Sequence, residues 1–288
     1  MTPPPQSSSD SAAAPTATFD ALAPGLSDAQ QRIVDGLRAD GIAVARFDEL
    51  LDQDLWRDAC ADIAPFVAEV EEATRDVGAA PADKEEVIVR RFYSKRESAR
   101  TTFAVDSPWL RVAASKQVLD VVNAYRGEQR WLFYVDNWYT VPYPNADARV
   151  ASQRWHRDPE DAHVVKVFVY FSDVSEEAGP FEYMRGSPSG GRHGGLWPWE
   201  EKNRYVEAPE LEAAIPAEER LTLTGGAGTI IFADTGGFHR GGFARTKPRI
   251  LSTFTYLVDD EKKGKRRFDV DFRGRREELP PQVRFALE

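Results

Sequence analysis

The chain has 288 residues, of which 42% are hydrophobic and 29% are charged, and its formal net charge is -10. This length and composition suit a globular protein with a substantial core, while the acidic balance argues against a nucleic-acid partner. The single cysteine, Cys60, excludes an internal disulfide and a cysteine-based zinc site, and it favours a reducing compartment. No stretch is apolar enough to span a bilayer and no signal peptide is evident, so we expect a cytoplasmic protein without membrane partners.

The first 20 residues differ from the rest in composition. They are mostly Pro, Ser, Ala and Thr, with almost no large apolar side chain. Such a segment cannot bury enough apolar surface to offset the entropy lost on ordering. We therefore expect residues 1–20 to be a disordered tail and residues 21–288 to form one domain.

A helix is predicted from Ser27 to the residue before Gly41. Ser27 and Gln30 have the spacing of a capping box, the apolar side chains that follow recur on one face, and glycine is the usual residue just after a helix end. The next residues, 41–47, read as a short strand.

Two further helical segments are predicted before the strands begin. Residues 52–75 have a helical pattern that should break near Pro65, because proline cannot donate its backbone hydrogen bond. Ser107 and Pro108 have the types preferred at the cap and first position of a helix. A helix or a helix pair should run from there to about Gly127.

From residue 131 the pattern changes to β-branched and aromatic runs between turns rich in Gly and Pro. Such runs are typical of strands, and no regular alternation of strand and helix accompanies them. Many strands with such turns favour a sandwich or barrel. The fold class is therefore mainly β with helical N-terminal support over 27–127 (α+β). The predicted strands cover residues 131–141, 164–171, 228–233 and 250–258.

The segment 189–222 interrupts this series of strands. It begins with glycines, contains Trp197, Trp199 and Tyr205, and then becomes acidic with a helical pattern. A long insertion between two strands is often a lid over a binding site. Its aromatic side chains could equally serve only to pack the insertion onto the core.

A basic cluster from Lys262 to Arg276 lies near the C-terminus. Runs of charged residues usually face water, so we expect a solvated edge strand and tail. A site for an anion is the alternative.

His156 and Asp158 are two residues apart on a segment expected to be extended, so their side chains should point the same way and could share one metal ion. His239, in a Gly-rich turn after the strand 228–233, would complete the two-His-one-carboxylate set of non-haem Fe(II) oxygenases. Arg249 could grip a carboxylate, such as that of 2-oxoglutarate, with two parallel hydrogen bonds. From these residues alone, a packed histidine with a surface Asp and Arg explains the pattern equally well.

The segment from about residue 41 to residue 258 resembles the phytanoyl-CoA dioxygenase family of Fe(II)/2-oxoglutarate oxygenases, and the order and spacing of its motifs match over most of the chain. The motifs that carry the resemblance are Gly41-Ile-Ala-Val-Ala45, Trp155-His-Arg-Asp158, Val167-Phe-Val-Tyr-Phe171, Gly179-Pro-Phe181, Arg185-Gly-Ser187, and His239-Arg-Gly-Gly242 with Arg249. One departure is Pro188, where the family often has histidine. That change puts a contact behind the metal site in doubt, not the metal site itself.

The resemblance implies a double-stranded β-helix (jelly-roll) core over about 131–258, with Fe(II) held by His156, Asp158 and His239. It implies that 2-oxoglutarate chelates the iron and pairs with Arg249, and that O2 is consumed with release of succinate and CO2. The product would be a hydroxylated small molecule. Because Asp158 is present, hydroxylation is favoured over halogenation.

Further contacts to the cosubstrate are predicted from neighbouring strands. Lys166 and Phe168 share one face of the strand 164–171, and both would border 2-oxoglutarate if that face points inward. Lys166 would then need a charge partner, which a carboxylate ligand supplies. A solvent-facing Lys166 is the alternative. Asn137 on the strand 131–141 and Gln153 before the metal ligands are further candidates for cosubstrate contacts.

Two other classes of function compete with the dioxygenase. A cupin-like protein could hold a metal or ligand without turnover, but it would have no need for an anchor such as Arg249. A metal-dependent hydrolase or isomerase would need a general base, and the sequence offers no clear candidate beside the three ligands. Fold analogy cannot choose the substrate.

Overall fold

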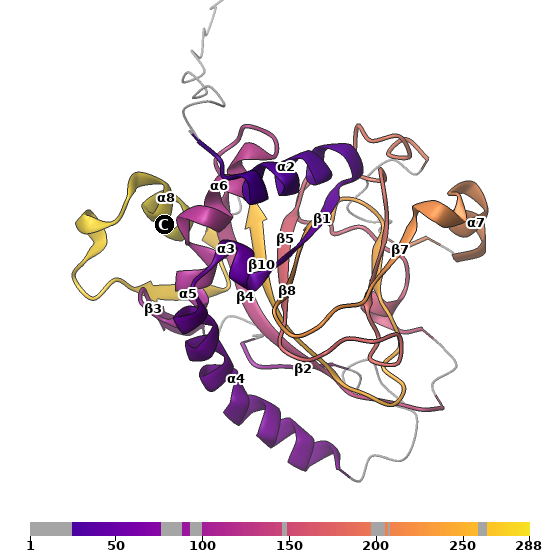
Figure 1. Ribbon diagram of the computed structural model, residues 1–288, viewed down its shortest axis with the longest axis horizontal. Coiled ribbons are helices and arrows are strands. Elements are labelled where there is room, and N and C mark those ends of the chain that lie inside the picture. Colours follow the sequence, from indigo (N-terminus) through magenta and orange to yellow (C-terminus); the bar gives the residue numbers. More distant parts are fainter. Residues whose placement is uncertain are drawn as a thin grey trace, which may run out of the picture.

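A computed structural model gives the structure of the protein, in which two sheets face each other and helices cover the outer face of the larger one (Figure 1). This arrangement is the predicted mainly β fold with helical support. The first 20 residues, predicted to be a disordered tail, lie outside the described residues. The structure describes residues 25–75, 88–92, 100–145, 149–196, 205–206, 208–258 and 264–288.

The larger sheet has six strands whose pairs are all antiparallel, and the smaller sheet has three. A separate parallel pair joins β11 (Phe268–Asp271) to β3 (Thr101–Ala104). In spatial order the larger sheet contains β1 (Ile42–Arg46), β8 (Thr229–Asp234), β5 (Val165–Tyr170), β10 (Arg249–Leu257), β4 (Trp131–Thr140) and β2 (Ile88–Arg90). The smaller sheet contains β7 (Arg220–Leu223), β6 (Phe181–Met184) and β9 (His239–Gly241).

All four strands predicted from residue 131 onward are confirmed, as β4, β5, β8 and β10, and the early strand is confirmed as β1. The strands of the smaller sheet were not predicted. Each has only three or four residues, which is too short to show a period of two. Because β7 begins at residue 220, the insertion predicted over 189–222 ends within a strand of the smaller sheet.

Seven helices are described, together with short 3-10 turns at Ala151–Gln153 (η1), Ala217–Glu219 (η2) and Arg276–Glu278 (η4). The predicted first helix is confirmed, with both hydrogen bonds of the Ser27 capping box and Gly41 in the left-handed region at φ 79°. Of the two alternatives predicted after Ser107, one helix or a helix pair, the structure has the pair. The helices are α2 (Asp28–Asp40), α3 (Phe47–Leu50), α4 (Gln53–Thr74), α5 (Pro108–Ala113), α6 (Lys116–Ala124), α7 (Ala208–Ala214) and α8 (Pro281–Leu287).

The predicted break at Pro65 is wrong, because α4 continues through it. Proline removes one backbone hydrogen bond from a helix, which does not end the helix when packing compensates. Side chains on both sides of Pro65, among them Ile63, Phe66 and Val70, are buried in the main core.

The alternation of β5 decides which side chains meet between the sheets. Val165, Val167 and Val169 pack against the helical layer, so Lys166 and Phe168 point to the opposite side. Phe168 there contacts Phe181 of the smaller sheet, with ring centroids 4.7 Å apart. Lys166 is only 6% exposed, which rules out the solvent-facing alternative.

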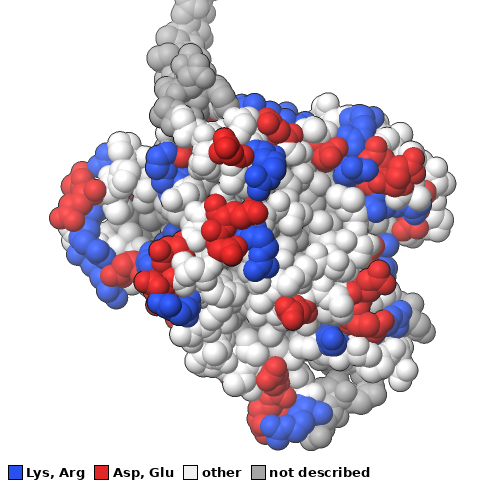
Figure 2. Space-filling view, viewed as in Figure 1, with Lys and Arg blue, Asp and Glu red and all other residues white. Residues whose placement is uncertain are grey.

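Acidic and basic side chains lie close together on the face shown in Figure 2. Exposed ion pairs include Arg32 with Glu49 and Arg111 with Asp58. Each such pair contributes about 0–1 kcal/mol, so stability rests mainly on the apolar layers. None of the described helices is long and apolar enough to cross a membrane.

Candidate active site

His156, Asp158 and His239 lie close together in the structure. One possible ligand atom from each side chain lies within 4.8 Å of the others, and all three residues are buried. His156 and His239 exchange backbone hydrogen bonds of 3.1 and 3.0 Å across the two segments that carry them. His239 is the first residue of β9, not part of a turn as the sequence suggested.

Backbone carbonyls fix the orientation of both imidazoles. The Nδ1 atom of His156 lies 2.8 Å from the carbonyl oxygen of Arg154, and that of His239 lies 3.0 Å from the carbonyl oxygen of Gly237. A carbonyl can only accept, so each Nδ1 carries the proton and donates. The lone pair is therefore on Nε2 of each ring, as a metal ligand requires.

The charges around the three residues also favour the metal-binding protonation states. Burial lowers the pKa of His239 to about 3, with His156 acting in the same direction, so the imidazole is neutral at physiological pH. Burial alone would raise the pKa of Asp158, but the ammonium of Lys166, with Nζ 2.6 Å from Oδ2, holds that pKa well below its usual range. Imidazole nitrogens from two histidines and one carboxylate form a set that suits a divalent transition metal with open positions.

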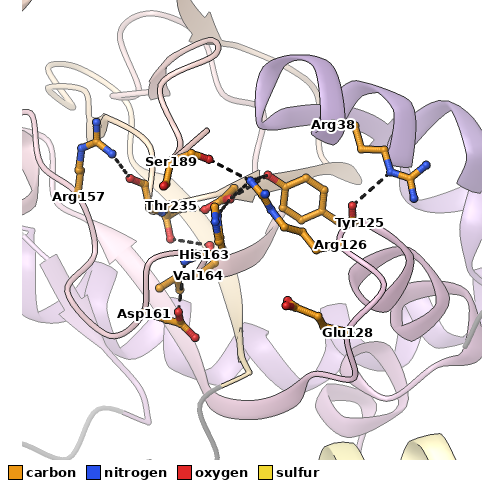
Figure 3. Close-up of polar contacts among 12 residues, drawn as sticks. Arg38, Tyr125, Arg126, Glu128, Arg157, Asp161, His163, Val164, Ser189 and Thr235 are labelled. Atoms are coloured by element: carbon orange, nitrogen blue, oxygen red, sulfur yellow. Dashed lines mark hydrogen bonds and ion pairs between the residues drawn. The ribbon is translucent and has the colours of Figure 1, made fainter. Parts of the chain in front are cut away.

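A network around the carboxylate of Asp234 supports the turn that leads to His239. Asp234 is fully buried at the end of β8, and it accepts hydrogen bonds from the Tyr125 hydroxyl and His163 Nδ1, both at 2.9 Å. Figure 3 shows the side chains of Tyr125 and Arg126, which follow α6, meeting that of His163 from the segment before β5. In the adjoining turn, the carbonyl of Thr235 accepts from the backbone N–H of Asp158 at 2.9 Å. The network therefore links α6 to both segments that carry the ligands.

Two glycines allow this turn to approach its neighbours closely. A Cβ at Gly236 would lie 2.2 Å from the carbonyl oxygen of Ala162, and one at Gly237 would lie 2.6 Å from the Tyr183 hydroxyl oxygen. One residue further on, the N–H of Phe238 donates to Ser187 Oγ at 2.7 Å.

Asp234→Asn is expected to destabilise the fold and weaken metal binding together. The asparagine amide would place an N–H donor against the donors of Tyr125 and His163, which should lower the free energy of unfolding by about 1–3 kcal/mol. Because the turn at residues 234–237 positions His239 and the backbone of Asp158, affinity for Fe(II) should fall several-fold. Urea unfolding and calorimetric metal titration measure the two effects. Asp173→Asn is the control, since Asp173 accepts only an exposed backbone bond from Ala227 among the described residues. Unchanged metal affinity would contradict this role for Asp234.

Arg249, the first residue of β10, provides a buried cation near the three candidate ligands. It is 3% exposed, and its Nη2 lies 3.5 Å from Thr140 Oγ1. The Nε and Nη1 atoms find no hydrogen-bond partner among the described residues. Buried donors without partners are costly, and burial lowers the pKa of Arg249. A carboxylate bound at this position would satisfy the donors and offset that cost, so the residue fits the distal end of 2-oxoglutarate.

One cavity of about 230 Å³ is lined by the three candidate ligands and by Arg249. Lys166 and Phe168 also line it, in agreement with the face predicted for them. Tyr205, which forms a β-bridge with His156, lines it from the predicted lid. The two tryptophans of that segment, Trp197 and Trp199, lie outside the described residues.

The other two predicted cosubstrate contacts are not among the residues that line this cavity. Asn137 faces the helical layer, where its Oδ1 accepts a hydrogen bond from Ser252. Gln153 is buried in η1, and its Oε1 accepts from the backbone N–H of Val150. The cavity wall is formed instead by their neighbours, Trp138 and Ser152.

Several side chains of the cavity wall were not predicted. Tyr134 and Trp138 are four residues apart on β4, so they share one face of that strand. The sequence did not show that this face points into the cavity. Arg90, Glu160 and Arg267 come from separate segments, and no sequence signal connected them.

Comparison with known proteins places these observations in a family. The family model described as Phytanoyl-CoA dioxygenase (PhyH) matches residues 37–249. No curated protein matches the sequence significantly.

Similar solved structures include the epimerase SnoN in complex with Fe3+, alpha ketoglutarate and nogalamycin RO, at 17% identity and a TM-score of 0.54, covering 80% of this chain and 83% of that chain. AviO1 from Streptomyces viridochromogenes Tue57 has 18% identity and a TM-score of 0.52, with 80% and 95% covered. EctD from S. alaskensis with bound Fe has 19% identity and a TM-score of 0.51, with 82% and 80% covered. At these identities the likeness supports the jelly-roll fold. Because the family model spans well over half of the chain, the protein belongs to the phytanoyl-CoA dioxygenase family.

Proposed function

We propose that the protein is an Fe(II)- and 2-oxoglutarate-dependent dioxygenase that hydroxylates a small-molecule substrate. The observation that carries the proposal is a buried site with two kinds of group in one cavity. His156, Asp158 and His239 offer a metal-binding set, and Arg249 offers buried donors without partners among the described residues. The first group fits the metal, and the second fits the distal carboxylate of the cosubstrate.

When bound, iron and 2-oxoglutarate supply the activation of O2, in which 2-oxoglutarate becomes succinate and CO2 while one oxygen atom enters the substrate. The chain's own residues prepare this chemistry. Lys166 keeps Asp158 ionised. Phe168 and Phe181 border the cavity with apolar rings, which limits the access of water to the reacting groups.

Two rival functions make different demands on these residues. A cupin-like binding protein without turnover has no use for a carboxylate anchor at Arg249. A hydrolase needs a general base next to the metal. The Lys166 amine is unsuited to that role because its ion pair with Asp158 raises its pKa. The carboxylate of Glu160, which also lines the cavity, lies beside the Arg267 guanidinium, with Oε1 3.9 Å from Nη2.

The experiment is to measure succinate formed from 2-oxoglutarate by the purified protein with Fe(II), ascorbate and air. A dioxygenase should release succinate above the protein-free background even without its substrate, and a candidate substrate should accelerate release and gain one oxygen atom. If succinate is released but the substrate gains no oxygen atom, 2-oxoglutarate is still the cosubstrate, and the reaction is an oxidation other than hydroxylation. If the iron-loaded protein forms no succinate, the dioxygenase is rejected, and the binding protein and the hydrolase are the remaining candidate functions.

A further inference from the structure

The cavity that holds the candidate metal ligands also contains charged side chains that the proposed chemistry does not use. Arg90, Glu160 and Arg267 line it from three different segments. Arg90 ends β2, Glu160 follows the ligand segment, and Arg267 immediately precedes β11 in the basic cluster noted in the sequence. The expectation that this cluster would only face water is therefore wrong for Arg267.

Arg90 is held against the wall formed by β4. It is the register partner of Trp138, and its guanidinium carbon lies 3.9 Å from the centroid of the Trp138 ring. Stacking of this kind leaves the edge of a guanidinium available for hydrogen bonds in the plane of the group. The indole N–H of Trp138 is buried and has no hydrogen-bond acceptor in the part of the chain that the structure describes.

Arg267 is held further along the same wall. Its guanidinium carbon lies 5.0 Å from the centroid of the Tyr134 ring, and its backbone N–H donates to the carbonyl of Phe133 at 3.2 Å. Its Nη2 lies 3.9 Å from Glu160 Oε1. The Arg267 side chain is 37% exposed, so it remains accessible from solvent.

Among the described residues that line the cavity, basic side chains outnumber acidic ones: Arg90, Lys166, Arg240, Arg249 and Arg267 against Asp158 and Glu160. Lys166 is paired with Asp158, and Arg240 is paired with Glu182 and Glu212. Near Arg90 the carboxylate is Asp136, with Oδ2 3.9 Å from Nη1, but burial raises the pKa of Asp136 to about 7. At neutral pH the Asp136 carboxylate is therefore only partly ionised.

We propose that the substrate carries an anionic group, a carboxylate or a phosphate, which binds to Arg267 and Arg90 on the β4 wall of the cavity. Two guanidinium groups stacked on aromatic rings are well suited to oxyanions, because each offers parallel N–H donors. A cationic substrate would instead meet the guanidinium groups of Arg90 and Arg267, and among the described residues that line this wall Glu160 is the acidic one. The inference rests on the proposed function in one respect, namely that the bound anion is the molecule oxidised.

The test compares matched probes on protein saturated with Zn(II) and 2-oxoglutarate, so that the candidate metal ligands and Arg249 are occupied. The probes are phenylacetate, phenyl phosphate, neutral phenylacetamide and cationic phenethylamine, titrated by calorimetry. At least one of the two anions should bind tenfold or more tightly than the amide, and the tighter of the two identifies carboxylate or phosphate as the preferred group. An amide that binds as tightly as both anions overturns the proposal.

Variants then assign the site. Arg267→Gln and Arg90→Gln should each weaken the anionic probe at least fivefold and leave the amide unchanged, whereas Arg267→Lys should retain part of the affinity. Glu160→Gln should tighten the anion, because it removes a competing negative charge. Arg276→Gln is the matched control, since Arg276 belongs to the same basic cluster but pairs with Glu288 at the surface. Unchanged anion binding in both Gln variants, or a cationic probe that binds best and is lost in Glu160→Gln, overturns the proposal.

The outcomes separate this inference from the proposed function. If the protein forms succinate but shows no preference for anionic probes, the inference of an anionic substrate is rejected and the proposed dioxygenase function stands. If anionic probes bind better in a manner that depends on Arg267 but the protein forms no succinate, the anion site is supported and its role in oxidation is rejected.

Discussion

Replacing His239 by Ala is expected to lower the affinity for Fe(II) by more than about a hundredfold and to abolish 2-oxoglutarate turnover. The variant removes one of the three candidate ligands, and loss of a group that only orients a ligand already costs roughly 10–100-fold in comparable sites. The fold should persist, because the main apolar cluster joins the helices to the outer face of the larger sheet and does not include His239. Calorimetric titration and circular dichroism measure the two properties.

Thermal unfolding provides a second measure of the same change. A metal that binds only the folded state stabilises it by about 2.7 kcal/mol at a hundred times its dissociation constant. Fe(II) under anaerobic conditions should therefore raise the Tm of the parent protein but not of His239→Ala. The matched control is His193→Ala, because His193 is not among the residues that line the cavity. A metal-dependent rise in Tm for His239→Ala equal to that of the parent would show that His239 is not a ligand.

The sequence predicted the long elements, and it selected the three candidate ligands that the structure brings together. The capping box at Ser27 and the aromatic and β-branched run of β4 are local signals. The pairing of His156 with His239 was inferred from residue types and from a family resemblance, and the antiparallel bridge between the two segments gives it a physical basis.

The side chains that line the cavity were harder to predict. Nearly every residue of β4 is buried, so no alternation of polar and apolar side chains indicates which face points between the sheets. Asn137 was therefore chosen as a cosubstrate contact, although the structure turns its neighbour Trp138 toward the cavity. Arg267 reaches the cavity because of the path of the chain before β11, which depends on tertiary contacts and not on local sequence.

Arg249→Lys is expected to raise the KM for 2-oxoglutarate by about ten- to a hundredfold while leaving Fe(II) affinity nearly unchanged. Lysine keeps the positive charge but loses the planar fork that makes two parallel hydrogen bonds to a carboxylate. Loss of one hydrogen bond to a charged group costs about 1.5–3 kcal/mol, and each 1.4 kcal/mol corresponds to a tenfold change. Succinate release at varied 2-oxoglutarate concentration gives the KM, and metal titration gives the affinity.

Arg245→Lys is the control for Arg249→Lys, because Arg245 is an alternative candidate for the residue that anchors 2-oxoglutarate. Arg245 is basic and close in sequence, yet it is absent from the cavity lining, and its Nη1 donates to the carbonyl of Pro144 at the surface. Arg245→Lys should therefore leave the KM unchanged. Lys166, the other candidate anchor, is already paired with Asp158. Lys166→Met should therefore weaken metal binding more than it weakens the binding of 2-oxoglutarate. If Arg249→Lys left the KM for 2-oxoglutarate unaltered while Arg245→Lys raised it, the anchor would have to lie outside the buried position that Arg249 occupies.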